Sequence, residues 1–181
     1  MEESTPRNLR LDAAAIVLTV VSLLVAASLA SYDPADPPST LVHPPHAVVR
    51  NWCGPVGARL ASWLVAGLGI GSWMIVAVGM AGAWRVFQRL SIPEAGWRML
   101  GLALTAPSLL ALLQRAPGLG GYTSVYGVGG AMGFLIARQL EAHLSHFGSL
   151  LVLLPGLAIG LLFLFDASLL RMLGWMGREI G

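Results

Sequence analysis

The chain has 181 residues, of which 56% are hydrophobic and 11% charged, and its formal net charge is +2. An ordinary soluble domain carries roughly 25% charged residues, so this composition excludes a soluble globular fold and predicts an integral membrane protein. All eleven basic residues are arginines, and the single cysteine, Cys53, excludes an internal disulfide and a cysteine-based metal cluster.

Four apolar runs are candidates for membrane spans, because about 20 helical residues match a hydrocarbon core of roughly 30 Å. They cover residues 13–30, 61–84, 99–113 and 149–165. The first follows a basic flank, so a signal peptide cleaved after "ASLA" is the alternative. The run is longer than the roughly 7–15 apolar residues of a signal peptide, which favours a retained span. Pro107 interrupts the third run, where we expect a kink.

A different pattern precedes the fourth run, at residues 129–147. Apolar side chains recur there at helical spacing from Met132 to Phe147, and Arg138, Gln139 and Glu141 occupy the other side. Each charge at the bilayer centre would cost about 2.5–3.5 kcal/mol. We therefore expect a helix that lies on the membrane or dips into it as a re-entrant segment. The predicted fold is a single all-α membrane domain over residues 1–181, with four transmembrane helices plus this amphipathic or re-entrant helix before the last span.

The distribution of arginines predicts the orientation of the spans. With the N-terminus inside, segments 1–12, 85–98 and 166–181 face the cytoplasm, and segments 31–60 and 114–148 face outwards. The inner segments hold Arg7, Arg10, Arg85, Arg89, Arg98, Arg171 and Arg178, and the outer ones hold Arg50, Arg59, Arg115 and Arg138. Basic residues favour the cytoplasmic side, so both termini are predicted to be cytoplasmic.

The sequence contains few groups of residues that could form a catalytic or metal-binding site. His43 and His46 lie in the predicted outer loop, and His143 and His146 lie three residues apart on the amphipathic helix. A metal site needs three or four ligands, so we interpret these histidines as solvated or interfacial, with metal binding or proton sensing as the alternative. The acidic residues near the spans lie at membrane edges, and no serine has a partnered base. No enzyme, cofactor, metal or small-molecule substrate is predicted.

Two short stretches carry a family resemblance. The first span ends in "SYDPADPP" and is followed by "NWCGPVGARLASWLVAGLGIGSW", and "GGAMG" occurs further along. This combination resembles the N-terminal membrane domain of the FtsK/SpoIIIE DNA translocases. The positions that carry the resemblance are Ser31, Tyr32, Asp33, Pro34, Asp36, Pro37, Asn51, Gly54, Gly57, Ala58, Gly129, Gly130 and Gly133.

The resemblance implies a membrane-anchoring and assembly module of a DNA translocase that acts in cell division and chromosome segregation at the bacterial inner membrane. The translocase motor needs a phosphate-binding loop with a lysine, and this sequence has neither the loop nor any lysine. We therefore expect no ATP hydrolysis and no direct DNA binding by these residues, with the motor located elsewhere. The alternative is an unrelated small multi-pass scaffold or transporter-like protein whose glycine-rich helices imitate the motifs.

The motif residues also have roles that follow from their chemistry. Asp33–Pro34 and Asp36–Pro37 are expected to form a rigid turn that ends the first helix, with recognition by an outer partner as the alternative. Gly67 and Gly71 are four residues apart, as are Gly129 and Gly133. Such pairs let helices approach closely. They pack helices within one chain or, as the family's hexameric assembly implies, mediate self-association; other division-site membrane proteins are the alternative partners.

Overall fold

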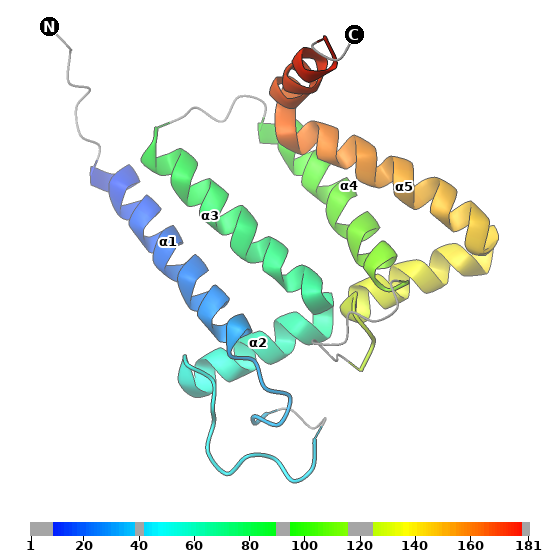
Figure 1. The fold of residues 1–181 in the computed structure, drawn as a ribbon. Helices are drawn as coiled ribbons and strands as arrows, with labels where there is room; N and C mark the ends of the chain where they lie inside the picture. The colour runs from blue at the N-terminus through cyan, green and yellow to red at the C-terminus, as the bar shows by residue number, and fades with distance from the viewer. Residues whose placement is uncertain (1–8, 39–41, 90–94, 116–124, 179–181) are drawn as a thin grey trace, which may run out of the picture.

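A computed structural model of the chain describes residues 9–38, 42–89, 95–115 and 125–178, with side chains described as far as Phe165. The described residues form helices and turns and no strand. The helices are α1 (Leu9–Ala30), α2 (Gly54–Leu68), the short 3-10 helix η1 (Gly69–Ser72), α3 (Trp73–Phe87), α4 (Ala95–Leu113) and α5 (Gly130–Arg178) (Figure 1).

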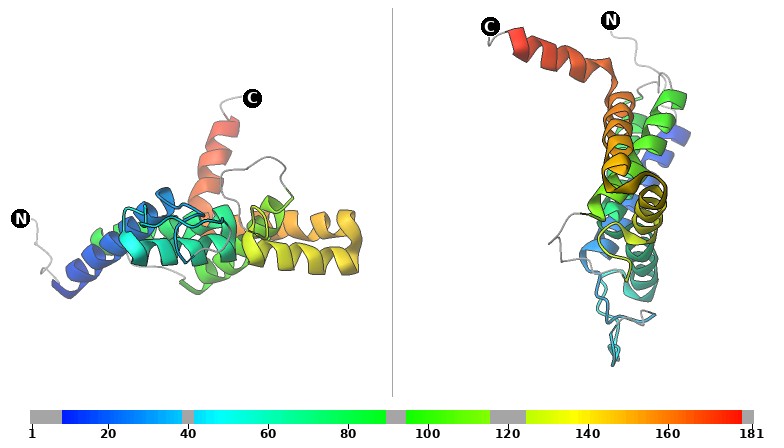
Figure 2. Two further views of the ribbon diagram at one scale, coloured as in Figure 1. Left: turned by 90° about the horizontal axis from the view of Figure 1, so that it is seen from below. Right: turned by 90° about the vertical axis from the view of Figure 1, so that its right-hand side faces the viewer.

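Four helical stretches are long and apolar enough to cross a membrane. They are Leu9–Ala30, Gly54–Phe87, Gly96–Leu113 and Gly130–Phe165. The predicted fold class, an all-α membrane protein with four such helices, is thereby confirmed. Residues up to about 165 form a thin slab, from which the last part of α5 projects (Figure 2).

The second predicted span, residues 61–84, is divided into two helices that point in different directions. α2 ends at Leu68, where Gly69 adopts a φ of 59°, and η1 then leads into α3. A positive φ favours glycine because it has no Cβ, and the Ser72 hydroxyl fixes the turn by donating to the Gly69 carbonyl at 2.8 Å. Figure 1 shows α2 lying crosswise to α1 and α3. The exact boundaries of the span stay a prediction, but its helix is interrupted.

The predicted amphipathic helix and the fourth predicted span are joined in α5. The helix runs from Gly130 to Arg178, but Ser145 has a φ of 59°, and the chain reverses direction near this residue (Figure 1). We call residues 130–144 the α5 arm and residues 146–165 the α5 span. The arm lies crosswise, and the span packs along α4. Because Ser145 is neither glycine nor proline, nothing in its identity signalled the reversal.

The molecule therefore consists of two similar halves. Each half has a long helix, a loop, a crosswise helix and a returning helix: α1, α2 and α3 in the first, and α4, the α5 arm and the α5 span in the second. The C-terminal end of α2 meets the N-terminal end of the α5 arm, so these two helices form one crosswise layer at the same side of the molecule (Figure 1). The N-terminus of α1 and the C-terminus of α3 lie at the other side.

Small residues line the contacts within each half. A Cβ added to Gly79 on α3 would collide with the Ser22 hydroxyl of α1, and one added to Gly160 on α5 would meet Thr105 of α4. Many large apolar side chains point outwards instead, among them Val17, Leu23, Val78, Leu151 and Phe165. Transmembrane helices associate through such small residues and leave large apolar side chains to lipid, so this distribution agrees with a lipid environment.

The two halves meet through backbone contact at glycines. A Cβ on Gly69 would overlap the Val128 carbonyl, and a Cβ on Gly130 would overlap the backbone of Gly67 and Gly69. The Ile70 amide also donates to the Val128 carbonyl at 2.9 Å. The joint between the halves thus has no room for a side chain at residue 69 or 130.

This joint makes a stability prediction for Gly130. Gly130 and Gly54 have nearly equal φ values, 64° and 63°, but no atom lies within 4 Å of a Cβ on Gly54. Gly54→Ala should therefore cost only the left-handed backbone penalty of about 1–2 kcal/mol. Gly130→Ala adds a collision with backbone and should cost at least about twice as much. Thermal unfolding in detergent would measure the stability of both variants. An equal loss of stability in the two would contradict the close backbone contact at Gly130.

Candidate functional site

The carboxylate of Asp36 is the centre of a buried polar cluster after α1. Asp36 is 3% exposed. Its two oxygens accept hydrogen bonds from the backbone amide of Arg50 at 3.0 and 3.1 Å and from the amide of Asn51 at 2.9 Å. The Nδ1 atom of His46 lies 3.1 Å from the same carboxylate, and the His46 amide donates to the Ala35 carbonyl at 2.9 Å. One carboxylate thus closes the whole loop between residues 36 and 51.

Asn51 extends the cluster to both neighbouring helices. Its buried side-chain amide donates to the carbonyls of Ser28 at 2.8 Å and Ser31 at 3.3 Å, at the end of α1. Its side-chain oxygen accepts from the Cys53 amide at 3.0 Å, just before α2. The Ser31 hydroxyl accepts from the Trp52 amide at 3.0 Å. Asn51 and Ser31 together fix the start of α2 against the end of α1.

The remaining positions of the first motif surround this cluster. A Cβ on Gly57 would collide with Asn51, Cys53 and the Ser28 hydroxyl, so only glycine fits there. Ala58 is 3% exposed, and Tyr32 packs against the small core of Val25, Leu29, Ala61 and Val65. The predicted motif residues of this region therefore belong to one site.

The two aspartates of this motif have different roles. Asp33 makes the local bond typical of such turns, accepting from the Ala35 amide at 2.9 Å. Asp36 instead bonds residues 10 to 15 positions away, which a local turn rule does not predict. The prolines Pro34 and Pro37 follow the two aspartates in the turn. The two Asp-Pro steps are thus a turn and a long-range anchor, not two equivalent caps.

Hydrogen bonds keep the Asp36 carboxyl ionised despite its burial. Burial raises the pKa of Asp36, but the Arg50 amide, the His46 side chain and the Asn51 amide together outweigh that effect and leave the pKa below its usual value. Hydrogen bonds to a carboxylate favour its charged form. The charge is therefore part of the folded loop.

The second motif, Gly129, Gly130 and Gly133, lies at the other end of α2 and packs against α4. Cβ atoms on Gly129 and Gly133 would collide with the Leu110 carbonyl. The Gly129 amide donates to the Gln114 side chain at 3.0 Å, and that side chain donates to the Tyr126 carbonyl at 2.6 Å. These glycines pack helices of one chain, the first of the two predicted roles.

Gly67 and Gly71, the other predicted glycine pair, lie in different environments. A Cβ on Gly71 would collide with Leu110 of α4, so Gly71 is also used within the chain. No atom lies within 4 Å of a Cβ on Gly67. Of this pair, only Gly67 has space for a neighbouring molecule.

Sequence reasoning missed a second polar cluster, at the reversal of α5. Arg115, just after α4, is 13% exposed in its side chain, and donates to Glu141 at 3.0 Å and to the buried Ser149 hydroxyl at 2.7 Å. His146 lies 3.2 Å from Glu141. The cluster connects the end of α4 with residues on both sides of Ser145. The two histidines of "HLSH" therefore differ in their surroundings: His146 lies beside Glu141, and His143 is exposed.

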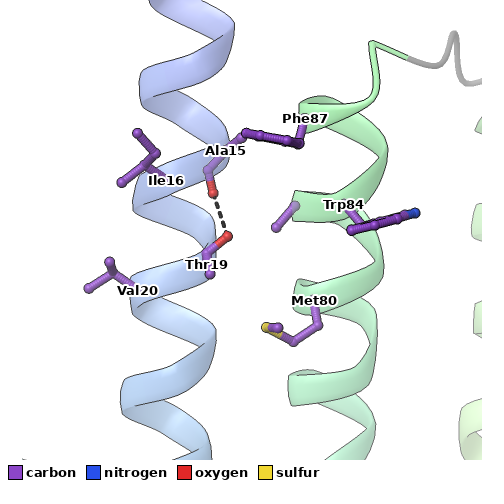
Figure 3. Close-up of a pocket in the computed structure, with 8 residues that line it drawn as sticks. Ala15, Ile16, Thr19, Val20, Met80, Trp84 and Phe87 are labelled. Atoms are coloured by element: carbon purple, nitrogen blue, oxygen red, sulfur yellow. Dashed lines mark hydrogen bonds between the residues drawn. The ribbon is translucent and has the colours of Figure 1, made fainter.

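The described residues offer little for catalysis. No group of three His, Cys, Asp or Glu side chains in the described part of the chain could hold a metal ion. An apolar cavity of about 270 Å³ lies between α1 and α3, where the Thr19 hydroxyl is bonded to the Ala15 carbonyl at 2.8 Å and the Trp84 indole nitrogen points away from α1 (Figure 3). A second, of about 360 Å³, lies between α3 and α4 with an apolar lining that includes Met74, Val78 and Leu102. Neither presents the polar groups that orient a polar substrate.

The Asp36 cluster makes a prediction with a defined pH dependence. Asp36→Asn replaces a charged acceptor of backbone amides by a neutral side chain with one acceptor oxygen, and should cost about 1–3 kcal/mol of unfolding free energy at neutral pH. Because the folded pKa is lowered, the carboxylate stabilises the fold fully above the unfolded pKa of about 3.9. This contribution is lost as the pH falls through the folded pKa. The difference between parent and variant should therefore shrink below about pH 4.

Thermal unfolding in detergent between pH 7 and pH 2.5 would measure this difference. Asp33→Asn is the matched control, since the Asp33 side chain is about one-third exposed, accepts a hydrogen bond from the nearby Ala35 amide, and lies farther from the His46 Nδ1 atom, at 3.8 Å, than Asp36 does at 3.1 Å. It should have the smaller effect at neutral pH. An Asp36→Asn variant as stable as the parent at pH 7, or a difference that grows towards low pH, would contradict the assigned role.

Comparisons of the sequence with known proteins identify one family. The family model of the 4TM region of DNA translocase FtsK/SpoIIIE matches residues 7–177. The chain is 30% identical over 169 residues to the DNA translocase FtsK of Azospirillum brasilense, and 25% identical over 170 residues to that of Shewanella oneidensis. These alignments cover 91% and 92% of the chain but only 26% and 19% of the relatives.

No solved structure matches the chain significantly. The family match covers nearly all of the chain and includes both motif regions, the four candidate membrane helices and the crosswise layer. The chain therefore belongs to the family of the 4TM region of the FtsK/SpoIIIE DNA translocases.

Proposed function

We propose that these residues act as the membrane-anchoring and assembly module of an FtsK/SpoIIIE-like DNA translocase, in cell division and chromosome segregation. The observation that carries the proposal is the family match over residues 7–177, which coincides with four helices able to cross a membrane. The chain spans about a quarter or less of the relatives that it matches. DNA translocation itself is thus assigned to a motor outside these residues, and the module is proposed to be non-enzymatic.

A chimeric translocase tests the proposal. The aligned membrane region of the Azospirillum brasilense relative would be replaced by residues 1–181, in cells that depend on that protein. We expect the chimera to insert into the inner membrane and to support division and segregation as the parent does. The matched control carries Gly130→Ala, which should weaken the joint between the halves and reduce function. An abundant, membrane-inserted chimera with no function would contradict the proposal.

Assembly through self-association is part of this proposal, and the glycines restrict where the contact can be. Gly71, Gly129 and Gly133 already contact Leu110 of the same chain, whereas Gly67 faces open space. Gly67→Leu in the chimera should therefore lower crosslinking between copies without unfolding the chain. Unchanged crosslinking would place the contact elsewhere, for example on other division-site membrane proteins.

The proposed orientation has both termini in the cytoplasm, at the bacterial inner membrane. The arrangement of the helices supports it, since the N-terminus of α1, the C-terminus of α3 and the N-terminus of α4 share one side (Figure 1). The ion pair between Arg89 and Asp12, at 3.6 Å, also lies at that side. These ends carry Arg10, Arg85 and Arg98, and basic residues favour the cytoplasm.

Cysteine accessibility tests the orientation. In a Cys53→Ser background, Pro45→Cys and Val125→Cys should react with a membrane-impermeant maleimide in intact spheroplasts. Ile92→Cys and Arg178→Cys should react only after the membrane is opened. The reason is that the first pair lies in the loops beside the crosswise layer and the second pair at the predicted cytoplasmic side. Labelling of Ile92→Cys from outside would contradict the orientation.

A further inference from the structure

The exposed face of α2 combines large apolar side chains with one arginine. Val56 and Trp63 are 71% and 72% exposed, and Arg59 lies between them at helical spacing, also exposed. Trp52, immediately before α2, is 76% exposed. The opposite face holds the buried residues Gly57, Ala58, Ala61 and Val65. α2 is therefore two-sided, with a packed face of small residues and an outer face, Val56, Arg59 and Trp63.

The orientation of α2 places this outer face at a single depth in the membrane. α2 lies crosswise to α1 and α3 (Figure 1); α1 is a candidate membrane span, and α2 and α3 are the two parts of the next candidate, Gly54–Phe87. Along a helix that crossed the bilayer, Trp52 and Trp63 would differ in depth by about 16 Å, because the rise is 1.5 Å per residue. A crosswise helix instead runs parallel to the membrane surface. If it connects the end of one span to the start of the next, both indoles lie at nearly the same depth, in the interface.

The chemistry of these side chains fits one occupant, a phospholipid headgroup layer. Tryptophan is enriched at membrane–water interfaces, and helices that lie in the interface combine tryptophan and other apolar residues with basic ones. The guanidinium of Arg59 makes no hydrogen bond or ion pair with the described residues, and a guanidinium matches the geometry of a phosphate. Arg138, on the α5 arm, differs because it already lies 6.0 Å from the ring of Phe134.

We propose that the outer face of α2 lies in the membrane interface and that Arg59 binds the headgroup of an anionic phospholipid there, with Trp52 and Trp63 as the flanking anchors. A lipid is favoured over a soluble protein partner because α2 starts beside the end of α1, a candidate membrane span, and leads through η1 into α3. The site lies on the face opposite to the packed face of α2, so a bound lipid does not disturb the packing of α2 against α1.

Quenching by brominated lipids tests this site. The full chain would be reconstituted in vesicles with Trp63 as the only tryptophan and, separately, with Trp52 as the only one; the others are replaced by phenylalanine. Both indoles should be quenched by lipids brominated near the headgroup, at depths that agree within about 5 Å instead of differing by about 16 Å. Brominated phosphatidylglycerol should quench Trp63 with about five-fold higher apparent affinity than brominated phosphatidylcholine, the factor expected for one arginine near an anionic surface.

Arginine variants identify the headgroup contact. Arg59→Gln should abolish the preference for phosphatidylglycerol and Arg59→Lys should keep most of it. Arg50→Gln is the matched control, since Arg50 is exposed in the neighbouring loop and uses its backbone amide, not its side chain, to bind Asp36; it should leave the preference unchanged. Because the tryptophan replacements could unfold the chain, lipid retention in native mass spectrometry would be measured on the same arginine variants of the otherwise unmodified chain.

Three outcomes would overturn the proposal. The first is Trp63 quenched by aqueous iodide but not by brominated lipid, which would indicate a face open to water or to a protein partner. The second is equal quenching by the two brominated lipids in the parent. The third is an equal loss of the preference in Arg59→Gln and Arg50→Gln, which would indicate a general effect of charge without a site at Arg59.

Discussion

The arrangement of the first half depends on one buried carboxylate. The carboxylate of Asp36, which is 3% exposed, accepts from the backbone amides of Arg50 and Asn51, so a side chain joins the two ends of the loop between α1 and α2. Asn51 then bonds the last turn of α1 and the residue before α2. Together with the bond from the Trp52 amide to the Ser31 hydroxyl, these bonds hold the start of α2 against the end of α1. The direction of α2 in turn determines where α3 begins and which residues Gly69 can meet.

The second half reaches a similar shape by other contacts. The two ends of its first loop are joined by the neutral side chain of Gln114, which bonds Tyr126 and Gly129. The reversal of α5 is accompanied by the ion pair of Arg115 with Glu141 and the bond to Ser149. A buried carboxylate bonded to backbone amides and a partly buried ion pair differ in their response to solvent, since salt screens exposed pairs more than buried ones. Salt should therefore weaken the pair of Arg115 and Glu141 more than the hydrogen bonds of Asp36.

Much of this fold could be predicted from the sequence, because hydrophobic length is a strong signal in membrane proteins. The four apolar runs and the separate character of residues 129–147 follow from hydropathy and helical spacing. The break at Gly69 could not be predicted in the same way. Residues 61–84, although rich in glycine and alanine, are as apolar throughout as an unbroken transmembrane helix. The reversal at Ser145 has no local signal in the sequence, and the contacts of Arg115 that accompany it are with Glu141 and Ser149, far along the chain.

The candidate site shows the same limit. The motif residues Asp36, Asn51 and Gly57 could be named from a family resemblance, but His46 and Ser28, which complete their hydrogen bonds, could not. Sequence spacing places Asp36 beside Pro37 and predicts a local turn. Its actual partners are backbone amides 14 and 15 residues later. Because every residue except proline has a backbone amide, residue types do not show which amides a side chain will bind.

The two halves are joined where the end of α2 meets the start of the α5 arm. Within the halves, close contacts involve both side chains and backbone: the Ser22 hydroxyl faces Gly79, and the Leu110 carbonyl faces Gly129 and Gly133. Between the halves, backbone meets backbone at Gly69 and Gly130, and two positive φ values leave glycine as the residue that fits without strain. α3 and α4 instead border an apolar cleft. The backbone contact between the halves thus lies in the crosswise layer, and next to it Gly71 of η1 meets the Leu110 side chain of α4.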